Sequence, residues 1–233
     1  MIRPRCLVVD VDDTLYLERD YVHSGLRAVG EAVSRLGVPG FREVADELFE
    51  AGTRGSIFDE ALIELGADHL LHHVPRLVAV YRRHVPRIAM LPDAVLALDQ
   101  ARRSGRVAAV TDGPADSQRR KVDALGLRRW ADPVVITDLL GPGYGKPHPR
   151  GFEAVEAAQP GLCMTYVADN PAKDFAEPAR RGWLTVRVRR PGGLHERAPS
   201  GADVQAEIPD LTGLEQLLDS LAALAESTGR RGG

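Results

Sequence analysis

The chain has 233 residues, of which 44% are hydrophobic and 27% are charged, and its formal net charge is −3 at pH 7. This size and composition exclude a disordered chain and suffice for one large domain, or for a domain with an insertion. The small negative charge leaves no basic footprint for nucleic acid or an anionic membrane, and no apolar run is long enough to span a bilayer.

Cysteine usage and the N-terminal sequence predict a cytoplasmic protein. Cys6 and Cys163 both lie in apolar, strand-like runs, so we expect buried free thiols and neither a disulfide nor a metal site. The first residues carry no signal-peptide pattern, because a strand-like run begins almost at once. These features are typical of a reducing compartment.

The first predicted element is a buried strand that ends in carboxylates. Residues 6–9 are all apolar, which is typical of a parallel strand buried on both faces. Asp10, Asp12 and Asp13 follow at once, and carboxylates this close repel one another unless a cation or a proton compensates. Because ligands bind beyond the carboxyl ends of strands in open α/β sheets, the cluster favours a metal-assisted reaction. The alternative is that Asp12 and Asp13 only cap a helix.

The next part of the chain is predicted to contain helices only. Apolar residues recur there at spacings of three and four, and glycines and prolines separate the segments. The expected helices cover residues 21–36, 41–50, 58–65, 75–84 and 92–103. Since no strand is expected from residue 15 to 91, we interpret residues 15–91 as an all-helical cap domain inserted into another domain.

Strands and helices alternate beyond residue 105. The expected strands are 107–110, 134–136, 164–168 and 184–188, and the expected helices are 114–125, 150–158 and 172–181. This alternation predicts an α/β fold with a parallel, doubly wound, Rossmann-like sheet. The expected core domain comprises residues 1–14 and 92–228, including a short edge strand at 204–208 and a last helix over 211–221. Residues 229–233 are expected to form a flexible tail.

Polar residues stand at the end of one predicted strand after another, and adjacent strands would bring them into one crevice. They are Asp10 and Asp12 after the first strand, Thr111, Asp112 and Gly113 after the second, Lys146 after the third, and Asp169 with Asp174 after the fourth. Taken singly, Thr111 could be a turn residue, Asp169 a helix cap and Lys146 a solvated charge. Their joint order makes coincidence improbable. Lys121 and Lys173 are expected to face solvent from helices.

This set is sufficient for phosphoryl transfer through an aspartyl intermediate. One carboxylate can attack phosphorus, and a second one two residues on can protonate the leaving oxygen and later deprotonate water. A cation must screen the carboxylate from the phosphate dianion, and Mg²⁺ prefers such oxygen ligands. The Thr111 hydroxyl and neighbouring backbone N–H groups can hold phosphoryl oxygens, and Lys146 can balance the charge of the transition state.

The same residues resemble the four motifs of the haloacid dehalogenase (HAD) superfamily over about residues 5–210. The resemblance rests on Asp10-Val-Asp-Asp-Thr-Leu15, Thr111, Gly145-Lys146-Pro147 and Asp169 with Asp174. The helical insertion is similar to the cap of the branch, subfamily I with a C1 cap, that includes phosphoglycolate phosphatases and β-phosphoglucomutases. Two positions depart from the family pattern: Ala168 stands where glycine is usual, and Asp112 stands where asparagine is commoner.

The resemblance implies a role for each of these residues. Asp10 would be the nucleophile and Asp12 the acid/base. The implied Mg²⁺ ligands are Asp10, the backbone carbonyl of Asp12, Asp169 and Asp174, and Asp174 would otherwise orient Lys146. The implied substrate-binding residues of the core are Thr111, Asp112, Gly113 and Lys146.

Residues in and near the predicted cap are further candidates for substrate binding. Arg54, in a Gly-rich turn, could contact the leaving group, although a loop arginine is as often solvated. Tyr16 and Tyr21 lie in the segment that joins the core to the cap, and they are weaker candidates.

We therefore expect a Mg²⁺-dependent phosphatase acting on a small phosphomonoester, either a sugar phosphate or a nucleoside monophosphate. It would be a monomer or homodimer without nucleic-acid or membrane partners. By resemblance, Asp12 argues against a true dehalogenase, and the lack of lysine from residue 1 to 120 argues against Schiff-base phosphonoacetaldehyde hydrolysis. Three alternatives stay open: a phosphomutase of the β-phosphoglucomutase type, a phospho-aspartate switch like a response-regulator receiver, and a non-catalytic protein that binds a phosphorylated ligand.

Overall fold

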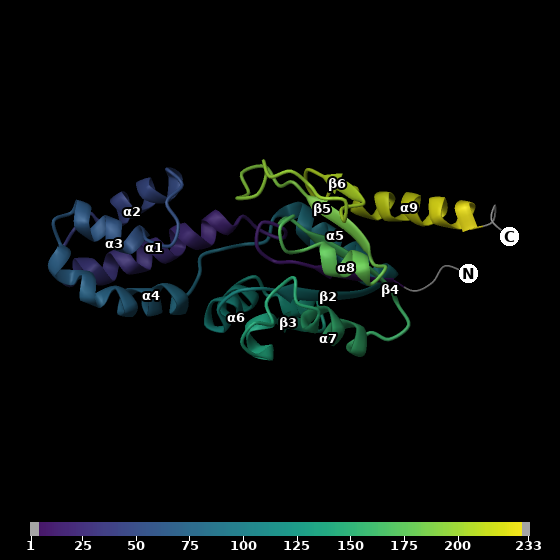
Figure 1. Ribbon diagram of the computed structural model, residues 1–233, viewed down its shortest axis with the longest axis horizontal. Coiled ribbons are helices and arrows are strands. Elements are labelled where there is room, and N and C mark those ends of the chain that lie inside the picture. Colours follow the sequence, from purple (N-terminus) through teal and green to yellow (C-terminus); the bar gives the residue numbers. More distant parts are fainter. Residues whose placement is uncertain (1–4, 230–233) are drawn as a thin grey trace. The chain divides into compact units, whose positions relative to one another are not determined.

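The computed structural model describes residues 5–229, which form two compact units (Figure 1). The sheet unit contains the described residues up to Leu17, Ala89–Gly113 and the described residues from Gly126 onward. The helical unit contains Glu18–Ile88 and Pro114–Leu125. The last of these segments therefore packs in the helical unit, whereas the sequence-based division assigns residues 114–125 to the core.

The sheet unit is built on six parallel strands. They are β1 (Arg5–Val9), β2 (Gly105–Thr111), β3 (Val134–Ile136), β4 (Cys163–Ala168), β5 (Leu184–Val188) and β6 (Ala206–Ile208), in the spatial order β3-β2-β1-β4-β5-β6. The chain moves outward from β1 to β3 and then continues on the other side of β1 with β4. Such a reversal of strand order creates a ligand-binding crevice at the carboxyl ends of the strands. The predicted α/β, doubly wound fold is confirmed.

Helices cover both faces of this sheet. The helices of the sheet unit are α5 (Pro92–Ser104), α7 (Arg150–Ala158), α8 (Ala176–Arg180) and α9 (Leu214–Gly229), with 3-10 turns at Leu127–Arg129 and Thr137–Leu140. Side chains of a strand alternate between the two faces. One face carries Val8, Val110 and Tyr166, which share a core with Phe152 of α7. The intervening residues, including buried Val9, face the other way, where α5 packs against β1 and β2.

The helical unit contains only helices and turns within its described residues. They are α1 (Glu18–Ser34), α2 (Phe41–Glu50), α3 (Ile57–Glu64), a 3-10 turn (Asp68–His73), α4 (Val74–Arg83) and α6 (Ala115–Ala124). Aromatic rings hold them together: Phe58 packs edge-to-face on Phe41 and on Tyr81. Tyr81 also lies so close to Gly25 that an added Cβ would be 2.3 Å from its ring, so α1 needs glycine there.

Both lysines assigned to solvent have partners in the structure. Lys121 is buried, with its Nζ 3.8 Å from a Glu18 carboxylate oxygen and 4.3 Å from the centre of the Tyr21 ring. Lys121 does lie in a helix, as expected, but its side chain contacts residues of α1 instead of solvent. Lys173 lies in a loop and is half-buried, and its Nζ is 3.4 Å from Asp112 Oδ2.

Three further expectations were wrong. Cys163 is exposed because it is the first residue of β4, whereas Cys6 is buried; both are free thiols. The helix expected over residues 172–181 is only α8, since the loop before it is held by side-chain hydrogen bonds described below. The last helix, expected over residues 211–221, covers Leu214–Gly229, and residues 230–233 of the expected tail lie outside the described residues.

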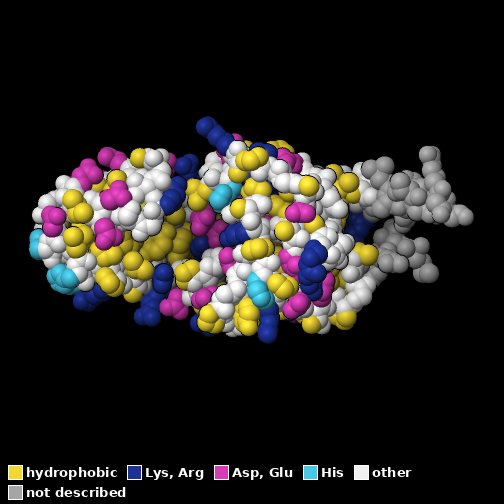
Figure 2. Space-filling view, in the orientation of Figure 1, with side chains coloured by type: hydrophobic (Ala, Val, Ile, Leu, Met, Phe, Trp, Pro, Cys, Tyr) yellow, Lys and Arg dark blue, Asp and Glu magenta, His cyan; other side chains and the backbone are white. Residues whose placement is uncertain are grey.

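The surface agrees with the small net charge. On the face shown in Figure 2, lysine and arginine side chains of the described residues are scattered among acidic ones. Among the described residues, no helix is both long and apolar enough to cross a membrane.

Candidate active site

The polar residues predicted to converge start from adjacent strand ends of the sheet unit. The Asp10 N–H donates to the Val167 carbonyl at 2.9 Å, which continues the pairing of β1 with β4 by one residue. Continued by one residue, this register sets Asp10 opposite Ala168, the last residue of β4, and Asp169 follows directly after it. Thr111 is the last residue of the neighbouring strand β2 and is fully buried.

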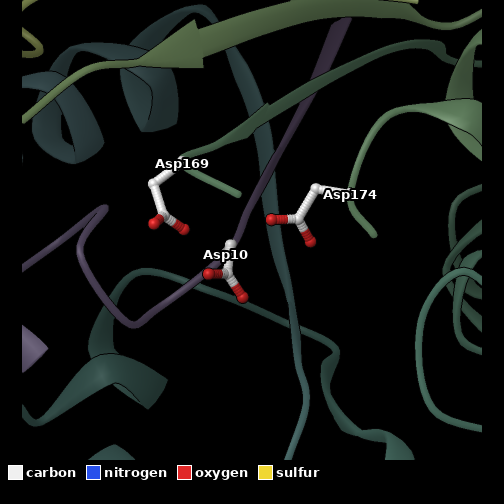
Figure 3. Close-up of side chains that lie close together, drawn as sticks. All are labelled: Asp10, Asp169 and Asp174. Atoms are coloured by element: carbon white, nitrogen blue, oxygen red, sulfur yellow. The ribbon is translucent and has the colours of Figure 1, made fainter. Parts of the chain in front are cut away.

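Three buried carboxylates form the centre of the site. Asp10, Asp169 and Asp174 each offer an oxygen atom within 4.8 Å of the others, and Figure 3 shows them grouped beyond the end of β1. The Lys146 Nζ lies 2.7 Å from an oxygen of Asp10 and 2.7 Å from an oxygen of Asp174. With all four groups ionised, three negative charges and one positive charge leave an excess of two negative charges. A divalent cation with oxygen ligands fits this donor set.

The proton affinities of these groups show the same excess of negative charge. Burial raises the pKa of Asp10 to about 6, although Lys146 opposes the rise. Burial raises the pKa of Asp169 to about 10, and the negative charges of Asp10 and Asp174 add to the effect. Burial alone would lower the pKa of Lys146, but Asp10 and Asp174 hold it well above its usual value. The lysine is therefore a permanent cation, and a second cation would favour ionised carboxylates.

Tyr166 is a site residue that sequence reasoning missed. Its hydroxyl lies 3.1 Å from Lys146 Nζ and 3.3 Å from Asp174 Oδ1, and the side chain is fully buried. Since Lys146 can only donate, the hydroxyl accepts from the lysine and donates to the carboxylate. A tyrosine in an apolar strand is normally a core residue, so no local pattern marks this one.

Asp112 holds the loop that carries Lys146. Its Oδ1 accepts a hydrogen bond from Thr137 Oγ1 at 2.5 Å and one from the Lys146 backbone N–H at 3.3 Å. Burial would raise the pKa of Asp112, but the Thr137 bond and the charges of Lys173 and Lys146 hold it below its usual value. The loop passes so close that a Cβ on Gly145 would lie 2.7 Å from Asp112 Oδ1. The negative charge of Asp112, which stands where asparagine is commoner in the family, therefore has its own cationic partners in Lys173 and Lys146.

Asp12 lies apart from the carboxylate centre and has a different partner. It is half-buried, and its Oδ1 accepts a hydrogen bond from the hydroxyl of Tyr16, a fully buried residue. Asp13, which has a positive φ of 50°, accepts a hydrogen bond from the Leu194 N–H at 2.7 Å. Tyr16 therefore contacts the candidate acid/base, and its contact with substrate stays a prediction.

The other candidates for substrate binding differ in how the structure places them. Gly113 follows β2 with a positive φ of 134°, a conformation that favours glycine. Arg54 is in the helical unit, where Nη1 donates to the carbonyls of Phe49 at 2.8 Å and Thr53 at 2.7 Å. Tyr21 is also in the helical unit and packs against Tyr81. Contact of Arg54 or Tyr21 with substrate stays a prediction.

Comparison with known proteins finds a matching family and curated relatives. Residues 4–175 match the model of a family described as haloacid dehalogenase-like hydrolase. The chain is 32% identical over 243 residues to a glyceraldehyde 3-phosphate phosphatase of Methanopyrus kandleri, a match covering 95% of this chain and 99% of the relative. It is also 32% identical over 185 residues to a phosphoserine phosphatase of Thermus thermophilus, covering 77% of this chain and 69% of the relative.

Two solved structures share the fold. One is the HAD-hydrolase YfnB from Bacillus subtilis bound to magnesium, with a TM-score of 0.66, 18% identity, and coverage of 93% of this chain and 99% of that one. The other is a 2-haloacid dehalogenase from Pseudomonas syringae, with a TM-score of 0.63, 21% identity, and coverage of 94% and 99%. Identities this low support the architecture alone.

Proposed function

Because the chain belongs to the haloacid dehalogenase-like hydrolase family, we propose that it is a Mg²⁺-dependent phosphatase that hydrolyses a small phosphomonoester through an aspartyl-phosphate on Asp10. The observation that carries the proposal is the position of Lys146, between Asp10 and Asp174 at 2.7 Å from each. A buried lysine bound to the nucleophile is placed to neutralise charge on a phosphoryl group that Asp10 attacks.

The first half-reaction follows from the surroundings of Asp10. Its carboxylate attacks phosphorus, the bond between phosphorus and the ester oxygen breaks, and an acyl phosphate forms on Asp10. Mg²⁺ held by Asp10, Asp169 and Asp174 would supply positive charge that allows a carboxylate and a phosphate dianion to approach. Thr111 and the backbone that leads to Gly113 lie at the end of β2, next to β1, where they can receive phosphoryl oxygens.

The second carboxylate supplies the proton transfers. Asp12 protonates the departing alkoxide oxygen and then removes a proton from the water that hydrolyses the acyl phosphate. Asp12 is not one of the three grouped carboxylates, and the hydroxyl of Tyr16 donates a hydrogen bond to its side chain. The products are the free alcohol and inorganic phosphate.

We infer a three-carbon phosphomonoester as the first substrate to test. The relatives in the comparison are named as phosphatases of glyceraldehyde 3-phosphate and of phosphoserine, and both compounds have three carbons. The glyceraldehyde 3-phosphate phosphatase aligns over nearly the full length of both chains, so its substrate is the leading candidate. Hexose phosphates and nucleoside monophosphates are the comparison classes.

Phosphate release from this panel tests the proposal. The reaction is run with Mg²⁺ and with EDTA, and the Asp10→Asn variant is compared with Asp116→Asn, a surface change in α6 of the helical unit. We expect turnover that requires Mg²⁺, is lost in Asp10→Asn and persists in Asp116→Asn. Folded wild-type protein that releases phosphate from no member of the panel would refute the proposal, and an isomeric product would indicate a phosphomutase.

A further inference from the structure

Arg187 of β5 is a cation buried in an unusual way. Its side chain is among the largest fully buried ones, and in the described part of the chain none of its hydrogen-bond partners is a carboxylate. The charges of Glu207 and Asp169 act on the guanidinium only electrostatically. Burial of a charge whose hydrogen bonds all go to neutral acceptors is costly, so a chain rarely keeps such a group for stability alone. The acceptors of the guanidinium indicate what this arginine does.

The first acceptor is the backbone of the candidate metal site. Arg187 Nε donates to the carbonyl of Asp169 at 3.0 Å, and the N–H of the same peptide unit, on Asn170, donates to Asp174 Oδ2 at 3.1 Å. One peptide is thus held at its oxygen by a cation and at its N–H by a carboxylate. The guanidinium polarises that peptide and strengthens its hydrogen bond to Asp174. Arg187 therefore acts on two of the three central carboxylates without touching either one.

The remaining donors of Arg187 organise a nearby segment, residues 193–200. Nη2 donates to the His195 carbonyl at 2.8 Å, and Nη1 donates to the Ala198 carbonyl at 2.8 Å and to Ser200 Oγ at 2.6 Å. This segment joins the site at two points, because the Leu194 N–H bonds to Asp13 and the His195 ring bonds to Asn170 at 2.9 Å. Arg187 thus also supports, through residues 193–200, the loops that follow β1 and β4.

We propose that Arg187 is a positioning residue that sets the affinity of the site for Mg²⁺ by orienting Asp169 and Asp174 through the peptide between residues 169 and 170. The inference rests on the proposed function, since it concerns the cation that the three carboxylates would hold. Groups that orient metal ligands in this indirect way typically change metal affinity by about 10- to 100-fold when they are removed.

Calorimetric titration of the metal-free protein with MgCl2 measures this affinity without turnover. In Arg187→Met we expect the Kd for Mg²⁺ to rise by about tenfold or more. Arg187→Lys should lie in between, because one ammonium can reach the Asp169 carbonyl but cannot also hold residues 195–200. The matched control is Arg181→Met, which removes a mostly buried arginine that pairs with Glu156 and Glu177 instead. Its Kd should equal that of the wild type.

The outcomes separate this inference from the proposed function. A folded Arg187→Met variant with wild-type Mg²⁺ affinity would overturn the inference, even if wild-type protein hydrolyses phosphomonoesters. Weaker Mg²⁺ binding in Arg187→Met, with no phosphate release by the wild type, would keep the inference and refute the function. Where Arg187→Met fails to fold, Arg187→Lys decides, and an unchanged Kd overturns the inference. Wild-type protein that binds no Mg²⁺ would refute both.

Discussion

Replacing Asp169 with asparagine should stabilise the metal-free protein and abolish the stabilisation that Mg²⁺ provides. The folded carboxyl has a pKa of about 10, whereas the ordinary value is 3.8, because it is buried and because the negative charges of Asp10, Asp174 and Asp13 act on it. Between these two values the metal-free folded protein binds more protons than the unfolded chain does, so its stability falls as pH rises through this window. Asparagine has nearly the same shape and no charge to desolvate.

The size of the effect follows from the same pKa values. The pKa of the unfolded carboxyl lies about three pH units below pH 7. The need to protonate Asp169 on folding therefore lowers the free energy of unfolding of the metal-free wild-type protein at pH 7 by up to about 4 kcal/mol. The asparagine amide leaves part of its hydrogen-bonding capacity unmet. We therefore expect Asp169→Asn to raise the free energy of unfolding by about half of this cost, about 2 kcal/mol. For a chain of this size, that gain corresponds to a rise in Tm of about 4–8 °C.

Thermal unfolding in EDTA and in saturating MgCl2, at several pH values from 5 to 9, measures both halves of this prediction. In EDTA, the wild-type Tm should fall as pH rises and the Asp169→Asn Tm should change less. Asp112→Asn is the control, and it should lower the Tm in EDTA. The pKa of the Asp112 carboxyl is held below its usual value, so its charge stabilises the fold. An Asp169→Asn variant less stable than the wild type in EDTA, or stabilised equally by Mg²⁺, would refute the reasoning.

The structure supports three further predictions. Lys146→Met should lower kcat by about 10²- to 10³-fold, since it removes the buried cation beside the nucleophile; steady-state kinetics with near-normal turnover would contradict this. Tyr16→Phe should lower kcat about tenfold for alkyl phosphates and less for para-nitrophenyl phosphate, whose leaving group needs no proton from Asp12; equal losses would argue against the Tyr16 contact. Mass spectrometry after thiol alkylation should find exposed Cys163 modified in the native protein and Cys6 modified only after unfolding, because burial raises the pKa of Cys6 to about 11. Equal labelling of both thiols would contradict the burial pattern.

The fold and the position of the crevice could be predicted from the sequence because both depend on local patterns. Buried parallel strands are rich in apolar residues, so β3 and β5 were identified with the bounds that the structure has. Polar residues that follow such strands must lie at one edge of the sheet, which is why Asp10, Lys146 and Asp174 could be expected to meet. Their distances agree with this expectation, whereas their catalytic roles await the experiments above.

Only the tertiary structure decided which polar side chains are buried and what they contact. Tyr166 and Arg187 lie in buried strands, and the sequence does not show what their polar groups contact. In the structure one hydroxyl joins Lys146 to Asp174 and one guanidinium holds the Asp169 carbonyl. Lys121 was expected to face solvent, since a lysine in a helix is usually solvated, and the sequence does not show that Glu18 lies next to it. The free energy of a buried polar group depends on partners far away in the chain, so such positions could be identified only after the strands and loops had been placed.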